Sequence, residues 1–203
     1  MDVSRPYDVQ GFRVFAGCLS RSEQAAMVGG VRTVLSAAPL FRPETARGRK
    51  MSVRMTSAGL VGWVSDRRGY RYEPCHPSGV GWPPIPDDVL SVWHAVAPEA
   101  REPDSCLINW YGDGARMGLH QDRDEADFSQ PVVSISLGDD ALFRIGNVAR
   151  GGKTRSVWLA SGDVVVMGGA ARLAHHGIDR VRHGSSTLLA QGGRINLTLR
   201  VAG

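Results

Sequence analysis

Apolar residues in the first half of the chain recur at helical spacing in two places. Residues 20–23 (Ser-Arg-Ser-Glu) have the form of a capping box, and the apolar residues that follow keep helical spacing until Pro39. A second helix is predicted to begin at residues 86–88 (Pro-Asp-Asp) and to end before Pro98. Between the two helices, residues 51–55 alternate between apolar and polar side chains, which predicts a strand.

From about residue 105 onward, the pattern changes to short apolar runs separated by glycine-containing turns. The predicted strands span residues 106–111, 131–137, 141–145, 154–159, 163–167 and 194–201. Short strands at intervals of roughly ten residues, with turn signals between them, are typical of a β-sandwich or jelly roll. The sequence therefore predicts a mainly β fold with an α+β N-terminal elaboration.

Length and cysteine usage narrow the class of protein. A chain of 203 residues has the size of one domain, so we expect a single domain over residues 1–203, with the elaboration at about 1–104 and the β core at about 105–203. Such a chain folds without disulfides or structural metal. The three cysteines (Cys18, Cys75 and Cys106) form no Cys-x-x-Cys pair, which argues against a zinc ribbon or a disulfide framework.

Composition excludes some partners and permits others. Hydrophobic residues make up 42% of the chain, an ordinary globular share that excludes intrinsic disorder. No apolar run reaches about 18 residues, and the N-terminus lacks the apolar core of a signal peptide, so we expect no membrane span and a cytoplasmic location. The formal net charge of +4 permits a polyanionic partner without requiring one. Nothing in the sequence calls for a dimer, so a monomer is expected.

Two separated motifs form a candidate metal site. In an extended segment, residues two apart point to the same side, so His120 and Asp122 can reach one metal ion together. His176, far along the chain, would complete a set of two histidines and one carboxylate, the facial triad of non-haem Fe(II) oxygenases. Such a triad leaves coordination positions open for substrate and oxygen. The alternative interpretation is a surface turn, because residues 121 and 123–125 are all polar.

A second candidate site lies near the C-terminus, where residues 194–200 (Arg-Ile-Asn-Leu-Thr-Leu-Arg) alternate strictly between polar and apolar. A solvent-facing strand would show the same alternation. However, Arg194 and Arg200 share one face and lie about 20 Å apart when the strand is extended. Their long side chains can lean inward and hold both ends of a small dicarboxylate by bidentate hydrogen bonds. Together with an iron triad, this clamp points to 2-oxoglutarate.

Four motifs, in this order and spacing, closely resemble the AlkB family of Fe(II)- and 2-oxoglutarate-dependent dioxygenases, which repair alkylated nucleobases. They are residues 106–111 (CLINWY), 118–125 (GLHQDRDE), 176–177 (HG) and 194–200 (RINLTLR). The resemblance runs from about residue 45 to the C-terminus and is strongest to bacterial members. It implies a double-stranded β-helix (jelly-roll) core that carries a nucleotide-recognition lid.

The resemblance also implies roles for single residues. His120, Asp122 and His176 would bind Fe(II), because the His-Gly pair of the family selects His176 over His175. The residues that match its 2-oxoglutarate contacts are Asn109, Tyr111, Arg194, Asn196 and Arg200. We expect Arg194 with Tyr111 at the distal carboxylate of 2-oxoglutarate and Arg200 at the end that chelates iron.

Substrate contacts are implied in the same way. Trp63 matches the aromatic residue that stacks on the flipped base, although a packing role in the core would also explain a tryptophan there. The other matching residues are Tyr70, Arg71 and Tyr72 on the nucleotide backbone, Asp124 near the exocyclic amine of the base, and Arg150 as a further contact. Two positions depart from the family pattern. Met167 stands where relatives often carry tryptophan, and Trp110 stands where a basic residue is common.

The implied activity is the oxidative demethylation of 1-methyladenine and 3-methylcytosine in single-stranded DNA, with RNA as a further substrate. O2 and 2-oxoglutarate would be co-substrates, and formaldehyde, succinate and CO2 would be released. One alternative is an enzyme with the same cofactors that acts on modified tRNA, protein or lipid. Another is a non-catalytic nucleic-acid-binding protein on a degenerate oxygenase scaffold.

Overall fold

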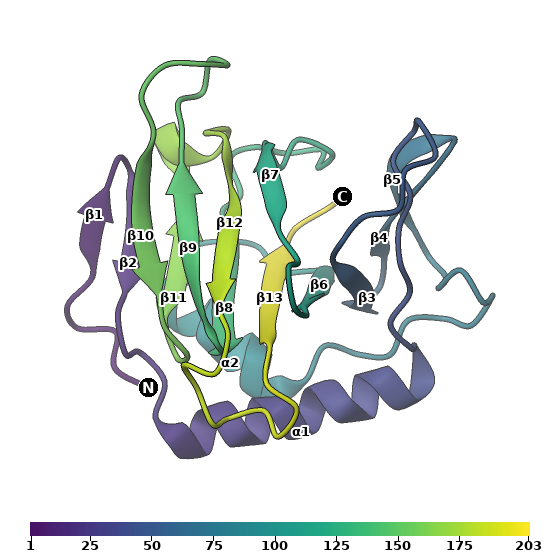
Figure 1. The fold of residues 1–203 in the computed structure, drawn as a ribbon, viewed down its shortest axis with the longest axis horizontal. Coiled ribbons are helices and arrows are strands. Elements are labelled where there is room, and N and C mark those ends of the chain that lie inside the picture. Colours follow the sequence, from purple (N-terminus) through teal and green to yellow (C-terminus); the bar gives the residue numbers. More distant parts are fainter.

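The computed structural model describes all 203 residues, and antiparallel sheets dominate it (Figure 1). The strands are β1 (Tyr7–Val9), β2 (Phe12–Phe15), β3 (Arg54–Gly59), β4 (Gly62–Asp66), β5 (Gly69–Glu73), β6 (Ser105–Tyr111), β7 (Met117–His120), β8 (Val132–Gly138), β9 (Asp140–Ile145), β10 (Arg155–Leu159), β11 (Val164–Met167), β12 (His176–Arg182) and β13 (Arg194–Arg200). The helices are α1 (Arg21–Ala37), α2 (Asp87–Val96) and the short 3-10 helix η1 (Gly169–Ala171). The predicted mainly β fold is confirmed.

Two large sheets, the separate two-stranded hairpin β4-β5 and a helical layer make up the architecture. The larger sheet has the order β1-β2-β11-β8-β13-β6-β3, and the smaller one has the order β10-β9-β12-β7. One apolar cluster, which includes Phe12, Phe143 and Leu159, fills the space between the sheets. A second cluster joins α1 and α2 to the outer face of the larger sheet, and Figure 1 shows both helices running beneath it. A cavity opens in this space between the two large sheets.

The two predicted helices are confirmed, and local sequence explains where α1 begins. The Ser20 side chain accepts a hydrogen bond from the Glu23 backbone N–H, and the Glu23 carboxylate accepts one from the Ser20 backbone N–H. This reciprocal capping box satisfies two of the N–H groups that a helix start leaves unpaired. The buried face of α1 then packs on α2 and the sheet. Neither helix has the length and apolarity that crossing a membrane would need.

Both faces of β13 are buried, so its alternation of polar and apolar residues does not separate a buried face from an exposed one. Ile195, Leu197 and Leu199 pack in the cluster that α1 and α2 cover. The opposite, polar face also lies inside the protein, because Arg194 is 0% exposed and Arg200 is 6% exposed. A solvent-facing strand is therefore excluded, and the polar face of β13 belongs to an internal site.

Several elements differ from the sequence prediction. Residues 51–53 are not part of a strand, since β3 begins at Arg54 and the Met51 N–H donates to the Pro43 carbonyl oxygen of a neighbouring loop segment. The prediction of a strand over 51–55 was therefore wrong for its first half. The short strands β1, β2, β4, β5 and β7 were not predicted. β12 was also missed, because a bulge between Ile178 and Arg180 interrupts its alternation. β1, β2 and β3 extend the larger sheet, so strands from both halves of the chain form it.

Candidate metal centre and substrate cavity

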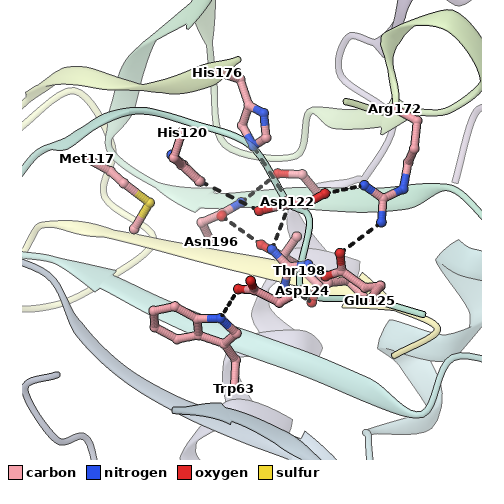
Figure 2. Close-up of polar contacts among 12 residues, drawn as sticks. Trp63, Met117, His120, Asp122, Asp124, Glu125, Arg172, His176, Asn196 and Thr198 are labelled. Atoms are coloured by element: carbon pink, nitrogen blue, oxygen red, sulfur yellow. Dashed lines mark hydrogen bonds and ion pairs between the residues drawn. The ribbon is translucent and has the colours of Figure 1, made fainter. Parts of the chain in front are cut away.

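The pairing of β7 with β12 brings the three candidate metal ligands together. His120 ends β7, His176 begins β12, and the two residues are direct partners in the antiparallel ladder. Asp122 follows two residues after His120, and its carboxylate oxygens lie 3.6 Å from His120 Nε2 and 3.7 Å from His176 Nε2. One donor atom from each residue lies within 4.8 Å of the other two. Figure 2 shows the two imidazoles directed toward the Asp122 carboxylate.

Backbone carbonyls fix which imidazole nitrogen faces this centre. His120 Nδ1 lies 2.9 Å from the Gly118 carbonyl oxygen, and His176 Nδ1 lies 3.1 Å from the Ala174 carbonyl oxygen. A carbonyl oxygen only accepts, so each Nδ1 carries the proton and each Nε2 presents a lone pair to the centre. This is the outer-shell arrangement that orients metal-bound histidines. The donor set of two imidazoles and one carboxylate therefore fits a divalent iron ion.

The charges around Asp122 keep the site ready for a cation. Burial by itself would raise the pKa of the Asp122 carboxyl, but Arg200 and the two imidazoles outweigh it and hold that pKa well below its usual value. Burial and the neighbouring His120 imidazole lower the pKa of His176 to about 4. At neutral pH the carboxylate is therefore ionised and His176 is unprotonated, the forms that bind a metal.

The polar face of β13 contains a buried positive charge, on Arg194, that forms no direct ion pair with a protein carboxylate. Arg194 is completely buried, and its hydrogen bonds go to neutral oxygens, to Ser136 Oγ at 2.8 Å and to the Asp139 carbonyl at 3.4 Å. Its Nε atom has no partner. Burial lowers the pKa of Arg194 to about 10. Because a buried charge without a direct ion-pair partner is costly, the surroundings of Arg194 fit an anionic ligand.

β6 supplies further polar groups beside β13. In the ladder, Tyr111 is opposite Arg194 and Asn109 is opposite Asn196. Asn109 Oδ1 is buried without a hydrogen-bond partner, and the Tyr111 hydroxyl has only a weak contact, at 3.8 Å, with Met117 Sδ. All five residues that the sequence assigned to 2-oxoglutarate line one cavity together with the metal ligands. Buried polar atoms without partners are rare, and their concentration here fits a small polar ligand.

The cavity has a volume of about 770 Å³, within the range of small-ligand sites. The hairpin β4-β5 forms one of its walls, and Trp63, Tyr70 and Tyr72 line it. Trp63 and Tyr70 are stacked, with ring centroids 5.4 Å apart. The Trp63 indole N–H donates to Asp124 Oδ2 at 2.8 Å, as Figure 2 shows, so the hairpin reaches across the cavity to the segment that carries Asp122.

Two residues from the predicted substrate set lie outside this cavity. Arg71 alternates with Tyr70 and Tyr72 on β5, so its side chain is on the opposite face, where it pairs with Asp66 and Glu73 of the same hairpin. Arg150 lies in the loop between β9 and β10. There it lines a smaller depression that also includes Leu119 and His120. The structure thus places Arg150 beside the cavity mouth and Arg71 away from it.

Two buried residues near the metal centre, Glu125 and Arg172, were not among the predicted site residues. Glu125, one of the polar residues that suggested a surface turn, has a side chain only 2% exposed and pairs with Arg172 at 3.0 Å and with Arg200 at 3.2 Å. Arg172 also donates to the backbone carbonyl of Asp122 at 2.6 Å. The surface-turn interpretation is therefore wrong for Asp122 and Glu125. No local signal marks Glu125, because its partners are distant in sequence.

The two departures from the family pattern have different surroundings. Met167 is buried and lines the cavity among the apolar residues between the sheets. Trp110 points away from the cavity, on the opposite face of β6 from Asn109 and Tyr111, with the Arg54 guanidinium 4.5 Å above its ring. Of these two residues, only Met167 is therefore in a position to contact a ligand in the cavity.

Comparison with known proteins supplies the family. Residues 11–200 match the 2OG-Fe(II) oxygenase superfamily. The α-ketoglutarate-dependent dioxygenase AlkB homolog of Caulobacter vibrioides is 55% identical over 96% of this chain and 89% of its own length. The chain is an AlkB-family 2OG-Fe(II) oxygenase. AlkB of Escherichia coli is 40% identical to this AlkB-family chain over 87% of it and 84% of the E. coli protein.

More distant similarities agree with this assignment. Mouse nucleic acid dioxygenase ALKBH1 is 28% identical over 68% of this chain, which covers 37% of the mouse protein. The solved structure of OsALKBH1 superposes with a TM-score of 0.80 at 30% sequence identity. The superposed part covers 96% of this chain and 98% of the OsALKBH1 chain. The jelly-roll prediction is thereby confirmed. As an AlkB-family dioxygenase, the protein uses Fe(II) with 2-oxoglutarate and O2, and His120, Asp122 and His176 form its iron site.

Proposed function

We propose that this AlkB-family enzyme removes methyl groups from alkylated bases in nucleic acids, with 1-methyladenine and 3-methylcytosine in single-stranded DNA and in RNA as substrates. The observation that carries the proposal is the aromatic hairpin over the metal cavity, where Trp63 and Tyr70 stack within reach of the iron ligands. Aromatic stacking on a base contributes about 1–3 kcal/mol. The name of the mouse relative, nucleic acid dioxygenase, supports the same class of substrate.

The charge beside the aromatic wall favours methylated bases over normal ones. Methylation at these ring nitrogens gives the base a positive charge and blocks its pairing edge, which lowers the cost of extruding it from a strand. The Asp124 carboxylate lies against the Trp63 indole, so a cationic ring stacked there would be close to a negative charge. We therefore assign base stacking to Trp63 and recognition of the cationic base to Asp124.

The remaining residues divide into cofactor and backbone contacts. In this proposal, Arg194 and Tyr111 bind the distal carboxylate of 2-oxoglutarate, Arg200 binds the carboxylate next to iron, and Asn109 and Asn196 line the space between them. When bound, Fe(II) with 2-oxoglutarate and O2 supplies the oxidising chemistry that releases the methyl group as formaldehyde, with succinate and CO2 as co-products. The protein orients both substrates and excludes water.

Contacts to the nucleotide backbone come from the edge of the cavity. Tyr70 is 51% exposed at the rim, and Arg49, Lys50 and Arg150 lie around the mouth, where they can attract phosphates. Tyr72 lines the same wall. For Arg71, the ion pairs within the hairpin support a role in stabilising β4-β5, and a direct nucleotide contact stays a prediction. Action as a single-domain monomer in the cytoplasm also stays a prediction.

The decisive experiment is a panel of methylated oligonucleotides, single- against double-stranded and DNA against RNA, with formaldehyde release as the measurement. Single-stranded DNA carrying 1-methyladenine or 3-methylcytosine should be demethylated, while His120→Ala and Asp122→Ala should show no turnover. Trp63→Ala should raise the KM for oligonucleotide while uncoupled 2-oxoglutarate turnover persists. Turnover only on modified tRNA, protein or lipid substrates would overturn the proposal.

A further inference from the structure

One short segment, residues 122–125, connects the lid hairpin to the metal centre. Asp122 contributes the carboxylate of the iron site, and the next two acidic residues each accept a hydrogen bond from the hairpin. Asp124 accepts from the Trp63 indole at 2.8 Å, and Glu125 accepts from the Tyr72 hydroxyl at 2.6 Å. The hairpin is therefore hydrogen-bonded directly to the segment that holds a metal ligand.

Glu125 is central to this connection, because its buried carboxylate lies between two guanidinium groups. Its Oε2 atom lies 3.0 Å from Arg172 Nη2, and its Oε1 atom, which accepts from Tyr72, lies 3.2 Å from Arg200 Nε. All three charged side chains are at most 7% exposed. Water does not screen these contacts, so the charge of Glu125 acts strongly on both guanidinium groups.

The same two arginines hold Asp122 from two sides. Arg200 Nη2 donates to Asp122 Oδ2 at 2.8 Å, and Arg172 Nη1 donates to the Asp122 backbone carbonyl at 2.6 Å. Figure 2 shows Arg172 between Asp122 and Glu125. In the proposed function, Arg200 also binds 2-oxoglutarate. A displacement of Glu125 would therefore move the guanidinium that contacts this co-substrate.

The hairpin is attached to the rest of the protein at two apolar patches. Val64 packs with Ala38 and Trp82 in a small separate cluster, and Trp63 packs against the large cluster between the sheets. A nucleic acid bound beneath Trp63 and Tyr70 would add contacts that hold the hairpin closed.

We propose that Tyr72 and Glu125 are positioning residues that couple the closure of the β4-β5 hairpin over a nucleic acid to the binding of 2-oxoglutarate by Arg200. The inference rests on the proposed function, since it requires a nucleic acid beneath the hairpin. Coupling between two binding sites is reciprocal, so each ligand strengthens the binding of the other by the same factor. The coupling makes the oxidant-forming co-substrate bind most tightly when a base is in place.

The test measures 2-oxoglutarate affinity by calorimetry, without O2, on the Fe(II)-loaded protein with and without a 1-methyladenine oligonucleotide. The wild-type protein should bind 2-oxoglutarate roughly five-fold or more tightly when the oligonucleotide is present. In Tyr72→Phe, which removes only the hydroxyl, this factor should fall below about two-fold. The matched change Tyr7→Phe, on the distant and exposed strand β1, should keep the wild-type factor.

A second variant tests the inner half of the connection without nucleic acid. Glu125→Gln keeps the shape of the side chain but removes the charge, and it should weaken 2-oxoglutarate binding about ten-fold, the scale on which outer-shell partners act. Glu102→Gln, a surface position paired with His94, is the matched control and should change nothing. Thermal unfolding establishes that each variant is folded, and Tyr72→Phe decides the matter if Glu125→Gln is not.

The outcomes separate this inference from the proposed function. A wild-type protein that binds the oligonucleotide but shows no coupling, or a Tyr72→Phe variant with full coupling, would overturn the inference alone. Unchanged 2-oxoglutarate affinity in a folded Glu125→Gln variant would also overturn it. A wild-type protein that neither binds nor demethylates the oligonucleotide would overturn the proposed function. In that event, weakened 2-oxoglutarate binding in Glu125→Gln would still support the inner half, from Glu125 to Arg200.

Discussion

Arg194 and Arg200 lie on the same face of β13, but the charges of the groups around them differ. Arg200 has two carboxylates within 3.2 Å, Asp122 and Glu125, whereas the hydrogen bonds of the fully buried Arg194 go to neutral oxygens. Desolvation of a guanidinium that lacks a direct ion-pair partner costs stability, and a bound carboxylate would recover it. The unliganded protein therefore carries a local instability that its proposed co-substrate relieves.

Replacing Arg194 should lower the affinity for 2-oxoglutarate without lowering the thermal stability of the unliganded protein. Arg194→Met removes the buried charge while keeping an unbranched side chain, so the unliganded protein should melt at an equal or higher Tm than the wild type. The 2-oxoglutarate affinity should fall about 30-fold or more, since loss of one partner from a buried charge pair costs roughly 2 kcal/mol or more. Differential scanning calorimetry and anaerobic 2-oxoglutarate titration measure the two quantities. A lower Tm with unchanged affinity would show that Arg194 is only structural.

At the level of elements, the contact between β7 and β12 determines the geometry of the iron site. A Cβ atom on Gly177 would lie 2.5 Å from the Met117 carbonyl oxygen and 2.7 Å from that of Gly118. Only glycine permits the two strands to approach so closely immediately beside the His120–His176 pair. This close approach gives a physical reason for a glycine directly after the second histidine.

Gly177→Ala should consequently weaken metal binding, because the added methyl group forces β7 away from β12 and separates the two imidazoles. We expect Fe(II) or Mn(II) affinity to drop about ten-fold or more, the scale seen when outer-shell support is removed. Gly118→Ala is the matched control, since a Cβ there meets nothing within 4 Å. Metal titration of both variants measures the effect. Equal affinities would show that the ladder adjusts without moving the ligands.

The sequence predicts those elements that have regular patterns and little dependence on distant partners. α1 follows from its capping box, and β13 follows from strict alternation, including which residues share the polar face. β12 contains a bulge, and the first part of the strand expected at residues 51–55 is a loop, in which the Met51 N–H donates to the Pro43 carbonyl oxygen, so contacts beyond the local pattern decide the structure there. The burial of Glu125 could not be predicted for the same reason, because the charge partners that stabilise it in the interior, Arg172 and Arg200, are distant in sequence.

For the molecule as a whole, the net charge of +4 is modest, so electrostatic attraction to a nucleic acid must come from the few basic residues around the cavity mouth. Arg49, Lys50, Arg116 and Arg123 are exposed and line the cavity, and Arg150 lines the neighbouring depression. With about five phosphate contacts, binding of single strands should be moderately sensitive to salt. A small footprint of this kind suits recognition of one lesion in a strand.

The expected salt dependence can be stated as a slope. A plot of log affinity against log salt for a single-stranded oligonucleotide should have a slope of about −3.5, from roughly 0.7 for each of about five phosphate contacts. Arg150→Ala should reduce the magnitude of this slope by about 0.7, and Arg21→Ala, on α1, should leave it unchanged. Fluorescence anisotropy over a salt series measures both. A slope near zero, or an equal effect of the two variants, would contradict the proposed phosphate contacts.

Residues 122–125 belong to no helix or strand, yet three of the four have assigned partners on different sides: the iron site, the Trp63 indole, and the Tyr72 hydroxyl with two guanidiniums. Deleting or inserting a single residue here would shift every partner at once. Surface connections normally tolerate changes of length, but this connection should not. Its length, more than the identity of exposed Arg123, should stay invariant in any functional variant of the enzyme.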